Sequence, residues 1–131
     1  YGRQFTLMLL DVEGLRGVNQ RHGIEAGDRI LSDLGTLLQR ELRAPDFVAR
    51  YGGDEFAVIM PETGEPAARE TLARIRRAVQ THPFDARGRL ELTAGWLHYP
   101  ATGVLTTEDL FSRAEAALAN AKLVAVASGH A

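Results

Sequence analysis

The hydrophobic positions of this chain fall into short apolar runs, typical of strands, and longer segments with helical spacing. Residues 5–10 form an apolar run that ends at Asp11, which predicts a buried strand. Residues 47–50 and 55–60 flank a Gly-Gly pair, and two strands around such a turn predict a β-hairpin. Residues 89–97 predict a further strand.

Four other segments are predicted to be helical. Residues 13–21 can hold one short helix, and a second begins at Gly27. Pro66 suits the first turn of a third helix, and Thr106 or Thr107 can cap a fourth. The apolar positions at helical spacing in the last three helices are Ile30, Leu31, Leu34, Leu37, Leu38 and Leu42, then Ala68, Leu72, Ile75 and Val79, and then Leu110, Phe111, Ala114, Ala117, Leu118 and Ala121.

These elements follow the order β-α-α-β-β-α-β-α. That order predicts an α+β fold, an α/β sandwich in which helices pack on a central antiparallel-rich sheet. The apolar residues 123–127 leave three interpretations open: a strand, a segment of the core or a chain end.

Composition narrows the classes of function. With 131 residues, 45% hydrophobic and 24% charged, residues 1–131 are expected to form a single domain. The absence of cysteine excludes disulfides, thiolate metal sites and cysteine nucleophiles. A net charge of −2 argues against a basic nucleic-acid-binding module, and no apolar run approaches the roughly 18 residues of a membrane span. No signal peptide is visible, and the abrupt start on a strand suggests truncation at the N-terminus.

Three carboxylates are candidates for chemistry. Asp11 follows the first buried strand, whereas Asp54 and Glu55 lie at the tip of the hairpin. If those strands are neighbours, the acids converge, and their mutual repulsion favours a bound cation such as Mg²⁺. Gly52 and Gly53 leave room for a ligand to approach the backbone. The alternative is a plain hairpin turn with solvated acids.

Residues 52–56 spell GGDEF, and the chain resembles the GGDEF family of diguanylate cyclases, which condense two GTP into cyclic di-GMP and release two pyrophosphates. The resemblance extends from residue 5 to residue 122. It implies a fold similar to nucleotide cyclases and polymerase palm domains. Further segments similar to family motifs are residues 10–19 (D-I-D-x-F-K-x-I-N), 23–31 (G-H-x-x-G-D-x-x-L), 43–50 (R-x-x-D-x-x-x-R), 92–95 (T-x-S-x-G) and 114–122 (A-D-x-A-L-Y-x-A-K).

The resemblance implies a divalent-metal site formed by Asp11, Asp54 and Glu55, with the carbonyl of Val12 as a further ligand. Mg²⁺ or Mn²⁺ is the implied cofactor. Asp54 is also the implied proton acceptor for the attacking 3′-hydroxyl, although the division of roles between Asp54 and Glu55 stays open. Arg16 replaces the family's usual Lys and is the implied contact that stabilises the transition state.

GTP is the implied substrate. Asn19 and Asp28 match the pair that recognises guanine, since Asp accepts from the N1–H and N2–H₂ groups and Asn both donates and accepts. On position alone, Asn19 fits a helix end and Asp28 fits an N-cap. The other residues implied to bind GTP are Gly14, Leu15, Gly52, Gly53 and Lys122, and of these Gly14 and Lys122 are implied to lie against phosphate.

Arg43 and Asp46 match the R-x-x-D product-inhibition site of the family. The match implies cyclic di-GMP as a second ligand and feedback inhibition of the enzyme. Arg74 falls where a secondary arginine of that site would lie, and a solvated basic helix face is the alternative.

Departures from the family pattern leave a second function open. Val126 stands where a phosphate-binding Arg is usual, Ile24 replaces a His, and the initial D-x-L-T-G-L-x-N-R-R stretch is absent. The alternative is a weak or inactive domain that binds cyclic di-GMP or GTP as a regulatory module. Because one site holds one GTP, catalysis implies a homodimer. An attached sensory or regulatory domain and a cytoplasmic location, in some cases within a membrane-anchored protein, are also implied; a nucleic-acid polymer is not an expected partner.

Overall fold

A central strand, β1 (Phe5–Glu13), is buried on both of its faces and organises the sheet. It pairs antiparallel with β3 (Glu55–Pro61) on one side and with β4 (Glu91–Tyr99) on the other. The edge strand β2 (Phe47–Arg50) pairs with β3, which gives the order β2-β3-β1-β4. The sheet and its β2–β3 hairpin confirm the predicted α+β fold. The computed structural model describes residues 4–82, 84, 90–101, 104 and 106–127.

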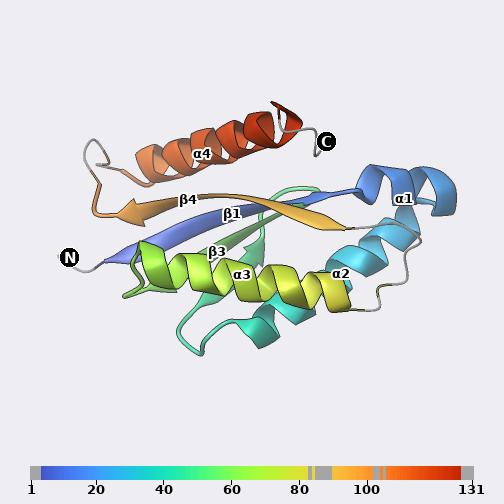
Figure 1. Ribbon diagram of the computed structural model, residues 1–131, viewed down its shortest axis with the longest axis horizontal. Helices are drawn as coiled ribbons and strands as arrows, with labels where there is room; N and C mark the ends of the chain where they lie inside the picture. Colours follow the sequence, from blue (N-terminus) through green and yellow to red (C-terminus); the bar gives the residue numbers. More distant parts are fainter. Residues whose placement is uncertain (1–3, 83, 85–89, 102–103, 105, 128–131) are drawn as a thin grey trace.

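Helices cover both faces of this sheet (Figure 1). α2 (Ile24–Glu41) and α3 (Glu65–Thr81) lie over one face, and α1 (Leu15–His22) packs against α2. α4 (Thr107–Ala127) lies over the opposite face. Successive residues of β1 point alternately into the two cores, which is why its sequence is an almost continuous apolar run. Of the predicted helix stripes, the fully buried members are Ile30, Leu31, Leu34, Leu37, Leu38, Ala68, Leu72, Ile75, Val79, Ala114 and Leu118.

Two element boundaries differ from those predicted at the N-terminal end. β1 does not end at Asp11 but continues to Glu13, because its pairing with β4 outlasts its pairing with β3. α2 begins at Ile24, three residues earlier than predicted, after Gly23 with a φ of 91°. Asp28 therefore lies inside α2, and its interpretation as an N-cap is wrong.

In the C-terminal half, the structure selects one of the two predicted helix caps and differs from the prediction at residues 123–127. Thr106 and Asp109 exchange backbone-to-side-chain hydrogen bonds of 3.1 Å in both directions, a capping box that identifies Thr106 as the cap of α4. Residues 123–127, and with them Val126, belong to α4. Arg89, predicted to begin the last strand, lies outside the described residues. In the described parts of the chain, no helix has the length and apolar character needed to cross a membrane.

α4 approaches β4 very closely at Gly95. A Cβ atom at this position would lie 2.1 Å from the backbone nitrogen of Leu118 and 2.6 Å from the carbonyl carbon of Ala117. Because backbone atoms on a packed helix cannot move aside cheaply, only glycine permits this approach. Gly95 therefore sets the distance between α4 and the sheet.

We expect Gly95→Ala to lower the free energy of unfolding by about 1–3 kcal/mol, since the added methyl group separates α4 from β4. Urea unfolding followed by circular dichroism measures the change. Gly35→Ala is the matched control: its Cβ would meet only the Phe56 ring at 3.6 Å, and alanine favours the helix by up to about 1 kcal/mol. Wild-type stability of Gly95→Ala would contradict the close approach.

Candidate active site

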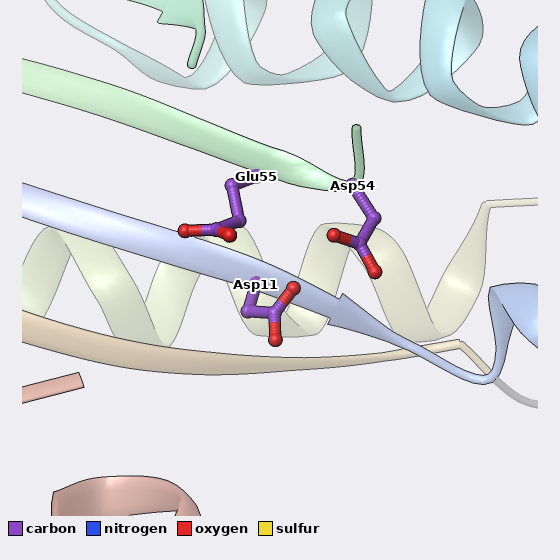
Figure 2. Close-up of side chains that lie close together, drawn as sticks. All are labelled: Asp11, Asp54 and Glu55. Carbon is purple, nitrogen blue, oxygen red and sulfur yellow. The ribbon is translucent and has the colours of Figure 1, made fainter. Parts of the chain in front are cut away.

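Three carboxylates meet where the pairing of β1 with β3 ends. Asp11 of β1 lies opposite Glu55, the first residue of β3, and Asp54 precedes Glu55 in the turn. The Val12 N–H donates to the carbonyl oxygen of Asp54 at 2.9 Å, which ties β1 to this turn. One carboxylate oxygen from each acid lies within 4.8 Å of the other two. Figure 2 shows the three side chains gathered at this point, so the predicted convergence is present.

Hydrogen bonds within the hairpin hold its tip in one shape. The N–H groups of Tyr51 and Gly52 donate to the carbonyl oxygen of Glu55, at 2.8 and 3.3 Å. The Arg50 guanidinium donates to the carbonyl oxygen of Gly53 at 2.6 Å. These hydrogen bonds close the turn, and the side chains of Asp54 and Glu55 project from its backbone.

Lys122 of α4 contacts the acidic cluster. Its ammonium forms an ion pair with Oδ2 of Asp11, whereas Oδ1 of Asp11 is buried without a hydrogen-bond partner. Asp11 as a whole is only 5% exposed. The lysine that the resemblance assigns to a phosphate therefore lies against a carboxylate in this structure.

Burial and a neighbouring charge shift the acid–base behaviour of three carboxyl groups at this point. Burial raises the pKa of Asp54, Glu55 and the neighbouring Glu13, and the charge of Asp11 raises all three further. The hydrogen bond to Asp11 raises the pKa of Lys122. The carboxyl groups thus hold protons more readily than isolated acids, and Lys122 holds its charge more firmly.

The donor set fits a hard divalent cation. Carboxylate oxygens are the ligands that Mg²⁺ and similar ions prefer, and three lie within reach of one another. Oδ1 of Asp11 is a buried hydrogen-bond acceptor without a donor. Buried polar atoms in folded proteins nearly always have a partner, so this oxygen calls for an explanation. A bound cation would satisfy that oxygen and offset the repulsion among the acids.

A pocket of about 480 Å³ opens beside Asp54, a volume suited to a small-molecule ligand. α1 begins at Leu15, after Gly14 with a φ of 95°, so its first turn borders the pocket together with the hairpin. The lining residues are Leu15, Arg16, Asn19, Gln20, Gly53 and Asp54.

The Asn19 side chain lines this pocket and packs against Gly27 of α2. A Cβ atom on Gly27 would lie 1.9 Å from Oδ1 of Asn19, so the side chain occupies space that only glycine leaves open. Oδ1 of Asn19 is buried and has no hydrogen-bond partner. Asp28, the next residue of α2, is exposed. The two residues that the resemblance assigns to guanine recognition therefore lie on two packed helices, Asn19 on α1 and Asp28 on α2.

Arg43 and Asp46 form a closed ion pair in the loop between α2 and β2. The Asp46 carboxylate accepts from the backbone N–H of Arg43 at 2.9 Å and from its guanidinium at 3.1 Å. The same guanidinium donates to the carbonyl oxygen of Pro61 and to Oγ1 of Thr63. The Asp46 side chain is 1% exposed and that of Arg43 is 51% exposed, so the guanidinium presents the accessible part.

Arg74 contacts the end of α2. Its guanidinium donates to the carbonyl oxygen of Glu41 and lies 3.6 Å from the carboxylate of the same residue. The Arg74 side chain is 41% exposed, so the residue is both partly solvated and held by α2. Its contacts are with Glu41, two residues before Arg43.

Sequence reasoning missed a contact between the hairpin and α4. The Tyr51 hydroxyl donates to Oε2 of Glu115 at 2.6 Å, and its ring stacks on Phe111 with 5.6 Å between centroids. The hydrogen bond to Glu115 raises the pKa of Tyr51. These partners are 64 residues apart, and the only signal in the sequence was an aromatic residue directly before the Gly-Gly turn.

Comparison with known proteins identifies the family that this chain matches. The model of the family described as diguanylate cyclase, GGDEF domain, matches residues 1–125. Diguanylate cyclase DgcP of Pseudomonas aeruginosa is 36% identical over 122 residues, which cover 92% of this chain and 18% of DgcP. Response regulator PleD of Caulobacter vibrioides is 37% identical over 89 residues, 67% of this chain and 20% of PleD. The chain therefore spans about a fifth of the length of these relatives.

Solved structures share the fold. Diguanylate cyclase SiaD of Pseudomonas aeruginosa, in complex with its activator SiaC, has a TM-score of 0.83 and 31% identity, over 94% of this chain and 48% of that chain. The GGDEF domain of DgcB from Caulobacter crescentus, in complex with c-di-GMP, has a TM-score of 0.81 and 28% identity, over 92% of this chain and 73% of that chain.

We expect Asp54→Asn to raise the melting temperature of the metal-free protein at pH 7. A carboxyl group whose pKa is raised in the folded state stabilises the fold below its unfolded pKa, and that contribution is lost as the pH rises through the folded pKa. Asparagine avoids this loss, with a gain of at most about 1 kcal/mol because partly exposed charges are screened.

Most of the gain should be lost at pH 3.5, below the unfolded pKa of about 3.9, where the carboxyl group is mostly protonated in both states. Thermal melting in EDTA at pH 3.5 and pH 7 measures both values. Glu70→Gln, an exposed acid on α3, is the control and should leave both melting temperatures unchanged. Equal melting temperatures of Asp54→Asn and wild type at pH 7 would contradict the repulsion within the cluster.

Proposed function

Because the chain belongs to the GGDEF family of diguanylate cyclases, we propose that it is a nucleotidyltransferase that condenses two GTP into cyclic di-GMP and releases two pyrophosphates. The observation that carries this proposal is the cluster of Asp11, Asp54 and Glu55, which borders a pocket lined by Asn19 and Arg16. This juxtaposition provides ligands for a cation next to space for a nucleotide.

The acidic residues hold the reacting groups. Asp11, Asp54 and Glu55, with the carbonyl of Val12, are the proposed ligands of Mg²⁺ or Mn²⁺. When bound, such a cation makes the attacking hydroxyl more acidic and offsets the charge of the leaving pyrophosphate. Asp54 is the proposed acceptor of the hydroxyl proton, in keeping with the raised pKa that burial and Asp11 give it.

Residues that line the pocket, and others outside its lining, are proposed to orient GTP. Asn19 and Asp28 are the proposed guanine contacts, and the unpartnered Oδ1 of Asn19 can accept from the base. Arg16, on the pocket wall, is the proposed transition-state contact. The other proposed GTP contacts are Gly14, Leu15, Gly52, Gly53 and Lys122.

The reaction requires two copies of this site. In each half-reaction the 3′-oxygen of one GTP bonds to the α-phosphorus of the other, the bond from that phosphorus to pyrophosphate breaks, and the hydroxyl proton passes to the base. One site of this kind accommodates one GTP, so the proposed active form is a homodimer with two-fold symmetry. The proposed setting is the cytoplasm, within a longer protein that carries a sensory or regulatory part.

A second function is supported by the exposed Arg43 guanidinium, which is fixed by Asp46 and Thr63. A planar guanidinium of this kind can bind a guanine edge or a phosphate. We propose that Arg43, with Asp46 and the nearby Arg74, forms a cyclic di-GMP site that inhibits the enzyme. If catalysis is weak, the same site makes the domain a cyclic di-GMP-binding regulatory module.

Asp54→Asn should lower the rate of cyclic di-GMP formation at least about a hundredfold, because it removes both a cation ligand and the proton acceptor. Chromatography of the products formed from GTP and Mg²⁺ measures the rate. Glu70→Gln should retain the wild-type rate. Undiminished product from Asp54→Asn would contradict the proposed catalytic role. A wild-type protein that binds cyclic di-GMP but forms none would favour the regulatory function.

Arg43→Ala should weaken the binding of cyclic di-GMP at least tenfold, since a hydrogen bond to a charged group contributes about 1.5–3 kcal/mol. Isothermal titration calorimetry measures the affinity, and Arg77→Ala on α3 is the control for loss of one positive charge. Thermal melting verifies that the loop closed by Arg43 still folds. Wild-type affinity in folded Arg43→Ala would exclude Arg43 from the site.

A further inference from the structure

The ion pair between Lys122 and Asp11 divides the carboxylate of Asp11 into two different oxygens. Oδ2 accepts from the Lys122 ammonium, and Oδ1 has no partner although it is buried. The carboxyl groups of Asp54 and Glu55 lie on the hairpin side of Asp11. One ammonium is thus paired with the buried member of a cluster of three acids.

The position of Lys122 is fixed by the packing of α4. Leu118, one turn before Lys122, lies against Gly95 of β4 at backbone contact distance. Glu115, seven residues before Lys122 and therefore on the same helix face, is hydrogen-bonded to Tyr51 of the hairpin. The Lys122 side chain is 42% exposed, so its ammonium can leave Asp11 without unfolding the helix.

The electrostatic consequence follows from charge alone. In the metal-free protein, the ammonium offsets part of the mutual repulsion among the three carboxylates. An incoming divalent cation encounters this positive charge beside its ligands, so its binding is opposed by Lys122. A triphosphate attracts the ammonium and would remove that opposition.

We propose that Lys122 is a built-in counterion of the acidic cluster, which stabilises the empty site and weakens metal binding until a triphosphate draws the ammonium away. This inference rests on the proposed function, because it concerns the same cation site. It gives Lys122 a role before nucleotide arrives, in addition to any phosphate contact. Metal and nucleotide would then each favour the binding of the other.

The test measures Mn²⁺ binding without nucleotide, by electron paramagnetic resonance of the free ion. Lys122→Met keeps the length of the side chain and removes its charge, and we expect about tenfold tighter Mn²⁺ binding. Lys122→Arg keeps the charge and should bind Mn²⁺ as wild type does. Arg77→Met removes one positive charge from an exposed position on α3 and should also leave the Mn²⁺ affinity unchanged.

A second readout is thermal melting in EDTA. Lys122→Met should melt at a lower temperature than wild type, and saturating Mn²⁺ should restore more of its stability than it adds to wild type. Unchanged or weaker Mn²⁺ binding by Lys122→Met would overturn the counterion role, the weaker result indicating that Lys122 positions Asp11 as a ligand. Binding of Mn²⁺ by neither protein would also overturn the counterion role, because removal of the ammonium would not have uncovered a site; the proposed catalytic function is tested separately, by product formation from GTP and Mg²⁺.

Discussion

The antiparallel register of β1 against β3 is the constraint on which the site depends. It places Asp11 opposite Glu55 and brings Asp54, by one backbone hydrogen bond to Val12, to the same place. A slip of one residue would turn Asp11 to the opposite face of the sheet, away from Lys122 and α4. The register is held by apolar side chains on both faces of β1, so the two cores determine the geometry of the acidic cluster.

At the acidic cluster, the arrangement that suits the proposed function also lowers the stability of the fold. Burial, together with the charge of Asp11, raises the pKa of Asp54 and Glu55, and their ionisation therefore costs folding free energy. Sites that bind charged ligands commonly retain such unfavourable contacts in the free protein. Here the hairpin hydrogen bonds, the contact of Gly95 with α4 and the ammonium of Lys122 hold the cluster together. The chain therefore folds with the three proposed cation ligands already close to one another.

Local sequence patterns predicted most of the fold and the core of the site. The apolar run before Asp11 and the Gly-Gly turn before Asp54 are signals carried by neighbouring residues, and strand pairing then brings the acids together. The contacts that sequence could not predict join distant segments: Lys122 with Asp11, and Tyr51 with Glu115. Both contacts depend on where α4 packs against the sheet. Gly95 determines that position through its close approach to the backbone of α4, and a single glycine leaves no periodic pattern in the sequence. The start of α2 was predicted three residues too late, because the positive φ of Gly23, which precedes the first helical residue Ile24, leaves no signal in the spacing of apolar residues.

We propose that the acids at the end of β1 and at the hairpin tip bind a divalent cation. A crystal structure with Mn²⁺ and a non-hydrolysable GTP analogue can locate that cation by anomalous scattering at the manganese edge. We expect an anomalous peak between the carboxylates of Asp11 and Asp54, with the nucleotide in the adjoining pocket. A bound nucleotide with its manganese held away from both residues would contradict this proposal.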